Sequence, residues 1–243
     1  GLQPGDMMCV LSPNLPEILV TDFACYSNRA IPVAIYATSS PEQIKYIIED
    51  AGANFIMVGT QDLYKSVRTI VSECPTLKKI IAADGIDLDS DDSFSLSFSD
   101  MLSLGAAASD SCRADVALRT AEASPDDIAT LIYTSGTTGE PKGAELLHSC
   151  FNSALEAHRE ILTNLSDKDT SVCFLPLSHI FEKAWTYLCL MLGIKVAINS
   201  NPKEIQAALP IVNPTCMCSV PRFWEKVYTA VQEKIAKMSG VQS

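Results

Sequence analysis

Short apolar runs alternate with segments of helical periodicity along most of the chain. The runs are rich in β-branched residues and have the length of strands buried in a parallel sheet. Between them, apolar residues recur at steps of three and four, as in residues 44–51 and 63–74, so that each set forms one stripe along a helix. This alternation predicts the α/β fold class, with mostly parallel sheets flanked by helices. The predicted strands are residues 7–11, 31–37, 55–58, 79–82, 128–133, 172–175, 195–198 and 215–220.

The periodic pattern lapses between residues 84 and 110, where Asp and Ser dominate. We predict a solvated surface excursion there, with a short helix around residues 98–104. This excursion divides the predicted organisation into a first βα subdomain, residues 1–123, which includes the acidic loop, and a second βα subdomain, residues 124–243.

A run of hydroxyl and glycine residues follows the predicted strand at residues 128–133, and we expect a helix after it. Glycine allows close approach to a ligand, and backbone N–H and side-chain O–H groups can converge on anionic oxygens, to which a lysine adds positive charge. A polar turn explains one or two glycines, but not a run of hydroxyls that ends in Pro-Lys-Gly. The candidate phosphate-binding residues are Thr134, Ser135, Gly136, Thr137, Thr138, Gly139 and Lys142.

Two familiar loops do not match this spacing. A Walker-type loop requires Gly-Lys followed by Ser or Thr, whereas Pro141 precedes Lys142 and Gly143 follows it. A nucleophile elbow requires Gly-x-Ser-x-Gly, whereas Tyr133 and Thr137 stand at the glycine positions around Ser135. Covalent catalysis by Ser135 is therefore not expected.

The composition limits the classes of partner and the compartment that we expect for this protein. Eighteen Lys and Arg against 29 Asp and Glu give a net charge of −11, which disfavours a sequence-independent grip on nucleic acid. The longest apolar stretch, near residues 188–194, is far shorter than the roughly 20 residues of a membrane span. Nine cysteines without a Cys-x-x-Cys pair predict reduced thiols in the cytoplasm.

Several motifs resemble the adenylate-forming enzymes, a family that includes acyl-CoA synthetases, luciferases and the adenylation domains of peptide synthetases. Residues 133–143 look like the family's phosphate-binding signature, including its terminal lysine. Residues 175–182, Leu-Pro-Leu-Ser-His-Ile-Phe-Glu, and residues 220–226, Val-Pro-Arg-Phe-Trp-Glu-Lys, look like the long-chain fatty acyl-CoA synthetase branch. Ser-Pro-Asp-Asp at residues 124–127 also agrees with the family's order of motifs.

The resemblance implies a ligase that activates a fatty acid with ATP to an acyl-adenylate and then transfers the acyl group to coenzyme A. It implies that the loop with Lys142 holds the β- and γ-phosphates, that Mg²⁺ binds there with Thr138, and that His179 lies beside the acyl carboxylate. Lys142 and His179 are thus the expected catalytic residues. A long-chain fatty acid is the expected substrate, with a medium-chain or aromatic acid as the alternative, and peripheral membrane contact through a lipid substrate stays open. The sequence indicates no oligomeric state.

Later motifs of the family are missing from the sequence: its Tyr-Gly-x-Thr-Glu segment, its Thr-Gly-Asp and its C-terminal lid domain. We therefore expect a fragment of the large N-terminal domain that is inactive alone. The alternative is a stand-alone module that binds a nucleotide or an acyl ligand without catalysis.

Overall fold

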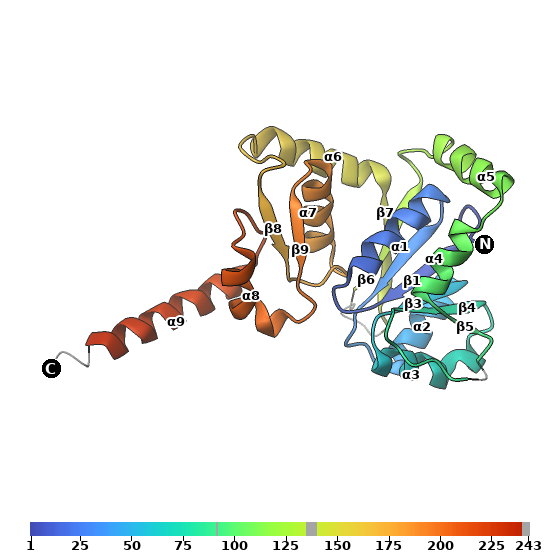
Figure 1. Ribbon diagram of the computed structural model, residues 1–243, viewed down its shortest axis with the longest axis horizontal. Helices are drawn as coiled ribbons and strands as arrows, with labels where there is room; N and C mark the ends of the chain where they lie inside the picture. Colours follow the sequence, from blue (N-terminus) through green and yellow to red (C-terminus); the bar gives the residue numbers. More distant parts are fainter. Residues whose placement is uncertain (91, 135–139, 240–243) are drawn as a thin grey trace.

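The computed structural model describes residues 1–90, 92–134 and 140–239, and its largest element is a seven-stranded sheet (Figure 1). The strand order is β5-β4-β3-β1-β2-β6-β7; the strands from β5 to β6 run parallel, and β7 pairs antiparallel at the edge. The strands are β1 (Met7–Leu11), β2 (Ile31–Ile35), β3 (Phe55–Val58), β4 (Lys79–Ala82), β5 (Ser95–Ser97), β6 (Ile128–Thr134) and β7 (Lys142–Leu147). The predicted α/β class with mostly parallel strands is confirmed.

Helices cover both faces of this sheet. One core contains the apolar stripes of α2 (Pro41–Ala51) and α3 (Gln61–Ile70), and the other contains residues of α1 (Pro16–Ser27) and α4 (Phe98–Ala106). Ile44 and Ile48 of α2 are fully buried, and each contributes roughly 2 kcal/mol of transfer free energy. Ser40 begins α2 with a reciprocal capping box to Gln43, so this helix starts at a defined residue.

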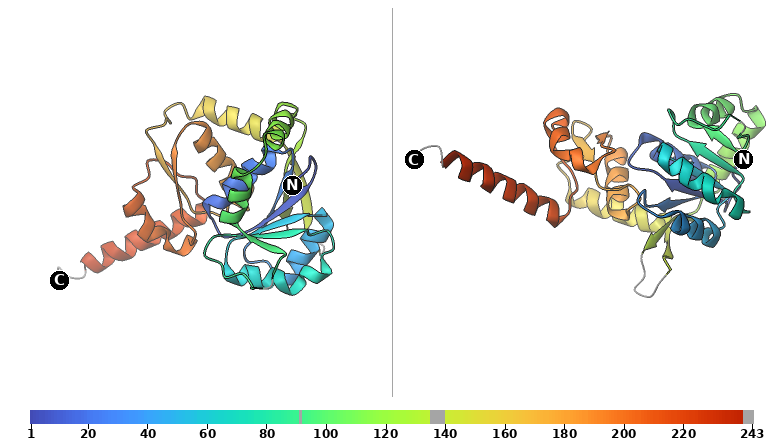
Figure 2. Two further views of the ribbon diagram at one scale, coloured as in Figure 1. Left: turned by 45° about the vertical axis from the view of Figure 1, so that its right-hand side comes forward. Right: turned by 90° about the horizontal axis from the view of Figure 1, so that it is seen from below.

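A second unit is built on a two-stranded parallel sheet of β8 (Thr170–Cys173) and β9 (Lys195–Ile198). α6 (His148–Ile161) leads into this unit, and α7 (Ile180–Met191) connects its two strands. The 3₁₀ turn η2 (Pro202–Glu204) and α8 (Ile205–Val212) follow β9. The last helix, α9 (Pro221–Ser239), extends away from the rest of the molecule in both views of Figure 2. Within the described ranges, no helix is long and apolar enough to cross a membrane.

A buried polar cluster joins the two units. Lys183 of α7 forms an ion pair with Asp22 of α1 at 2.6 Å, and both side chains are at most 1% exposed. Tyr187 of α7 donates a hydrogen bond to the same carboxylate oxygen at 2.8 Å, and its hydroxyl lies 3.0 Å from that of Tyr26. α1 therefore contacts the second unit through charge and hydrogen bonds that water does not reach.

One predicted strand is wrong, and the acidic excursion contains more regular structure than the sequence predicted. Residues 215–220 form no strand: in the described chain this segment has only an isolated bridge, from Cys216 to Ser171. Thr215 and Cys216 both donate to the carbonyl of Thr170, so the ladder does not advance. The acidic excursion contains the predicted helix as α4, but it also contains β5, and a further helix, α5 (Asp110–Ala121), follows it.

Candidate functional site

Two of the phosphate-loop candidates lie on the paired strands β6 and β7. Thr134 is the last residue of β6 and Lys142 the first of β7, and the two are cross-strand partners with exposed side chains. The expectation of a helix directly after the loop is wrong, because β7 intervenes. Ser135, Gly136, Thr137, Thr138 and Gly139 lie outside the described residues.

A close contact explains the glycine that ends the signature. A Cβ atom on Gly143 would lie 3.0 Å from Cζ of Tyr133, its cross-strand partner, so a larger residue would press on the ring. The hydroxyl of Tyr133 donates to Asp50 of α2 at 2.6 Å, and burial together with this carboxylate raises the Tyr133 pKa well above its usual range. Tyr133 and Gly143 therefore fix the pairing of β6 with β7. This pairing sets the position of Lys142, the residue next to Gly143.

A small cavity of about 220 Å³ lies beside this pair of strands. Tyr133 and Pro141 form one wall, and Tyr36 and Gln43 from the β2–α2 region form another. The cavity and Thr134 both lie at the carboxyl ends of parallel strands, which is where α/β sheets commonly bind ligands.

His179 lies in the second unit, in the loop between β8 and α7. It is the N-cap of α7, with an exposed side chain whose Nδ1 accepts a hydrogen bond from the N–H of Phe181 at 3.2 Å. Among the described residues, no hydrogen bond joins His179 to Thr134 or Lys142. The structure thus brings Thr134 and Lys142 together as neighbours and places His179 on a separate loop.

Two polar side chains, neither of them predicted from the sequence as a site residue, form hydrogen bonds that hold the loop that carries His179. Asn14, in the loop before α1, donates to the carbonyl of Leu175 and accepts from the N–H of Leu177, both at 2.8 Å. Glu182 of α7 accepts from the N–H of Leu175 at 3.0 Å and lies 3.4 Å from the thiol of Cys218. Only the three-residue spacing of Glu182 from His179 signalled a position in the first turn of that helix.

Burial has the largest effect on the pKa of Glu182. Its side chain is fully buried, and desolvation raises its pKa to about 7, although the hydrogen bonds from Cys218 and Leu175 favour the ionised form. The carboxyl group thus exchanges its proton near neutral pH while it contacts the loop of His179 and the segment that leads to α9.

The Ser-Pro-Asp-Asp segment has a structural role in front of β6. Asp127 receives two hydrogen bonds from the guanidinium of Arg29, at 2.9 and 3.1 Å, and one from the N–H of Ser124. The hydrogen bond from Arg29 lowers the pKa of this carboxyl below its usual value. Arg29 itself has a φ of 53°, in the turn that precedes β2. This cluster ties the starts of β2 and β6 together and so sets the position of Thr134 at the far end.

The family model and the similar proteins in sequence agree on one family. The family model described as "AMP-binding enzyme" matches residues 1–242. The long-chain-fatty-acid–CoA ligase FadD15 of Mycobacterium bovis is 31% identical over 97% of this chain, which covers 38% of that relative. The peroxisomal long chain acyl-CoA synthetase 6 of Arabidopsis thaliana is 28% identical over 100% of this chain, which covers 34% of that relative. The chain thus spans little more than a third of these relatives' length.

Solved structures share the fold. A long-chain-fatty-acid–CoA ligase from Archaeoglobus fulgidus aligns with a TM-score of 0.69 and 21% identity, over 96% of this chain and 43% of that one. An anthranilate–CoA ligase in complex with anthranoyl-AMP aligns with a TM-score of 0.73 and 21% identity, over 89% of this chain and 40% of that one. With Thr134 and Lys142 of the signature at the carboxyl edge of its sheet and a family match along nearly its whole length, the chain belongs to the AMP-binding enzyme family.

Proposed function

We propose that the protein carrying this chain is an AMP-forming acyl-CoA synthetase that acts on long-chain fatty acids. A carboxylate oxygen of the fatty acid attacks the α-phosphorus of ATP, and pyrophosphate leaves. The thiol of coenzyme A then attacks the acyl carbonyl, loses its proton, and AMP leaves. The relatives support the substrate class, because two of the proteins similar in sequence carry long-chain names.

The observation that carries this proposal is the pairing of Thr134 with Lys142 at the open end of the sheet. In the proposal the two residues bracket the segment that receives the triphosphate, and Lys142 offsets charge that builds on the departing pyrophosphate. Transfer of this kind depends on positioning and charge neutralisation rather than on a protein nucleophile. His179 is proposed to lie next to the carboxylate, on a loop fixed by Asn14 and Glu182.

Mg²⁺ belongs to the proposal as the ion that accompanies ATP and would neutralise phosphate oxygens. Thr138, its proposed contact, lies outside the described residues. Among the described residues, no group of three or more His, Cys, Asp or Glu side chains could hold a metal ion. The proposal therefore makes no use of a preformed metal cage in this chain.

The cytoplasm is the proposed compartment. All nine cysteines fall in the described part of the chain, and each is a free thiol there. Burial raises the pKa of Cys25 and of Cys189 to about 12, which keeps these thiols protonated and unreactive.

The test is ATP–pyrophosphate exchange by the full-length protein against a panel of carboxylic acids. We expect exchange with palmitate that exceeds exchange with octanoate and benzoate, and AMP as the nucleotide product. ADP as product would contradict the reaction class, and preferred exchange with benzoate would contradict the substrate class. Nucleotide binding without exchange for any acid would favour the alternative of a binding module.

A further inference from the structure

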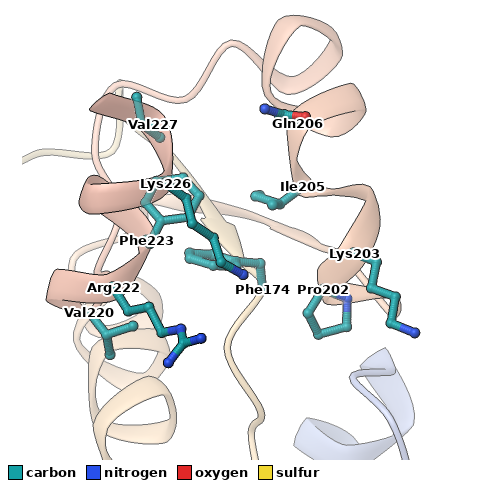
Figure 3. Close-up of a pocket in the computed structure, with 10 residues that line it drawn as sticks. All are labelled: Phe174, Pro202, Lys203, Ile205, Gln206, Val220, Arg222, Phe223, Lys226 and Val227. Atoms are coloured by element: carbon teal, nitrogen blue, oxygen red, sulfur yellow. The ribbon is translucent and has the colours of Figure 1, made fainter. Parts of the chain in front are cut away.

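A cavity of about 470 Å³ lies between η2, α8 and the first turns of α9 (Figure 3). Phe174, which directly follows β8, lies at its centre, and Pro202 and Ile205, which follow β9, form one side. The cavity is thus located at the carboxyl ends of both strands of the second sheet. Its volume falls in the range of roughly 300 to 1,000 Å³ that is usual for small-molecule sites.

Positive charge gathers around this cavity. Arg222 and Lys226 are one helical turn apart on α9. Lys226 extends to Phe174, Arg222 extends below it at the edge of the cavity, and Lys203 stands on the opposite rim and extends outward (Figure 3). Of the described residues that line the cavity, none is Asp or Glu. In the described chain, none of the three cations forms an ion pair with a carboxylate. The positive lining of this cavity thus has the opposite sign to the protein's net charge of −11.

The remaining lining is aromatic and aliphatic. The ring centroids of Phe174 and Phe223 are 5.2 Å apart, and the rings are tilted by 49°. Phe174 is buried at 4% exposure, and Ile205 is buried next to it. A ligand in this cavity would therefore meet cations on one side and apolar surface on the other.

We propose that this cavity binds a phosphate group attached to an apolar or ring-containing moiety, with Arg222 and Lys226 on the phosphate and Phe174 and Phe223 against the attached moiety. The charge count favours phosphate over carboxylate, because a carboxylate balances only one of the two cations, Arg222 and Lys226, whereas a phosphate monoester carries up to two negative charges. The arginine adds a planar fork that matches phosphate oxygens. The N-terminus of α9, which borders the cavity, favours an anion in the same place.

This site is separate from the proposed function, which assigns the triphosphate of ATP to the β6–β7 hairpin in the other unit. The same phosphate chemistry occurs in coenzyme A, whose 3′-phosphate neighbours a purine nucleoside, and in phosphatidic acid, whose phosphate neighbours acyl chains. The experiment has to distinguish these two sources and has to report on this cavity alone.

We propose to measure the rate of lysine acetylation in the full-length protein by mass spectrometry, because this rate reports on single lysines and can be compared between ligands. Lys226 reports on the cavity, and Lys234, an exposed lysine on the same helix, is the internal control. The probes are coenzyme A, dephospho-coenzyme A, short-chain phosphatidic acid, inorganic phosphate and palmitate. We expect a phosphate-bearing probe to slow acetylation of Lys226 at least about fivefold and to leave Lys234 unchanged, because a charge-assisted contact with the bound phosphate shields the amine.

The arms assign the source. If coenzyme A protects Lys226 and dephospho-coenzyme A does not, the bound group is the 3′-phosphate of coenzyme A. If phosphatidic acid alone protects Lys226, the ligand is a lipid. Arg222→Gln should raise the probe concentration needed for half-maximal protection of Lys226 at least about tenfold. Arg222→Lys should keep part of the protection, which shows that the variant proteins are folded. The proposal is overturned if no phosphate probe protects Lys226, if Lys226 and Lys234 are protected equally, if palmitate alone protects, or if Arg222→Gln changes nothing. None of these outcomes depends on pyrophosphate exchange, so the site and the proposed activity can fail independently.

Discussion

Single buried polar side chains position the loop of His179. Asn14 reaches this loop from the first unit, and Glu182 reaches it from the helix that the loop begins. Each satisfies backbone groups that would otherwise be buried without a partner, which costs about 1–3 kcal/mol per group. A change at either residue should therefore act on the geometry of His179 rather than on chemistry at a substrate.

The first prediction concerns Glu182 and pH. Its pKa rises from 4.5 to about 7 on folding, so between these values the folded protein holds a proton that the unfolded chain has released. The free energy of unfolding should fall as pH rises through this window, by about 3 kcal/mol in total from this residue. Glu182→Gln should flatten that slope in urea unfolding measured between pH 4.5 and 8. Glu225→Gln, an exposed change on α9, should leave the slope as it is; an unchanged slope in Glu182→Gln would contradict the burial argument.

The second prediction concerns Lys142. Lys142→Ala in the full-length protein should slow adenylation roughly ten- to a hundredfold, because one charge-assisted contact to the departing phosphates is lost. Thioester formation from supplied acyl-adenylate should stay nearly unchanged, since pyrophosphate has left by then. Single-turnover assays of the two half-reactions measure this, with the exposed Lys168→Ala as control. Equal loss in both half-reactions would argue against the assigned role.

Between elements, the contact of α1 with α7 depends on a buried ion pair. Asp22 and Lys183 are both out of water, and Tyr187 donates to the same carboxylate oxygen. Such a pair adds little net stability relative to apolar residues, but removal of one partner leaves a charge buried and unpaired. The pair therefore specifies how the two helices face each other more than it increases stability.

A double-mutant cycle tests this at the level of the two helices. Asp22→Leu alone and Lys183→Met alone should each lower the free energy of unfolding by about 3–5 kcal/mol, whereas the double variant should lose much less than their sum. Urea unfolding of the four proteins gives the coupling energy. Additive losses would mean that the two charges do not stabilise each other in the folded protein.

At the scale of the molecule, the chain contains two sheets whose strand ends carry different parts of the candidate site. β6 and β7, beyond the predicted division at residues 123 and 124, pair with the first sheet, and β8 and β9 form their own. The division stays a prediction about how the chain is organised. The chain covers 38% and 34% of two relatives, so the proposed reaction draws on the full-length protein.

The corresponding prediction is that residues 1–243 by themselves show no ATP–pyrophosphate exchange with palmitate. The family's Tyr-Gly-x-Thr-Glu segment, its Thr-Gly-Asp and its C-terminal lid domain are missing from this sequence, so we expect part of the transition-state stabilisation to be missing too. Circular dichroism and a cooperative unfolding transition would show that the isolated chain is folded. Exchange above background would show that those motifs are dispensable.

The sequence by itself determined the fold class, most strands of the large sheet, the helical stripes and the phosphate-loop signature. These features are local, because strand and helix periodicity and a contiguous motif are written in neighbouring residues. The match of β1, β3, β4 and β9 to the predicted bounds follows from their short apolar runs between polar turns.

The tertiary structure alone decided the partners of residues that are distant in sequence. Asn14 lies 163 residues before Leu177, to which it is bonded, and Lys183 lies 161 residues after Asp22. β7 was missed because its six residues, four of them exposed, take their strand conformation from pairing with β6. The cationic cavity depends on the contact of Phe223 in α9 with Phe174, which lies 49 residues earlier, and no local pattern encodes a contact between such distant segments.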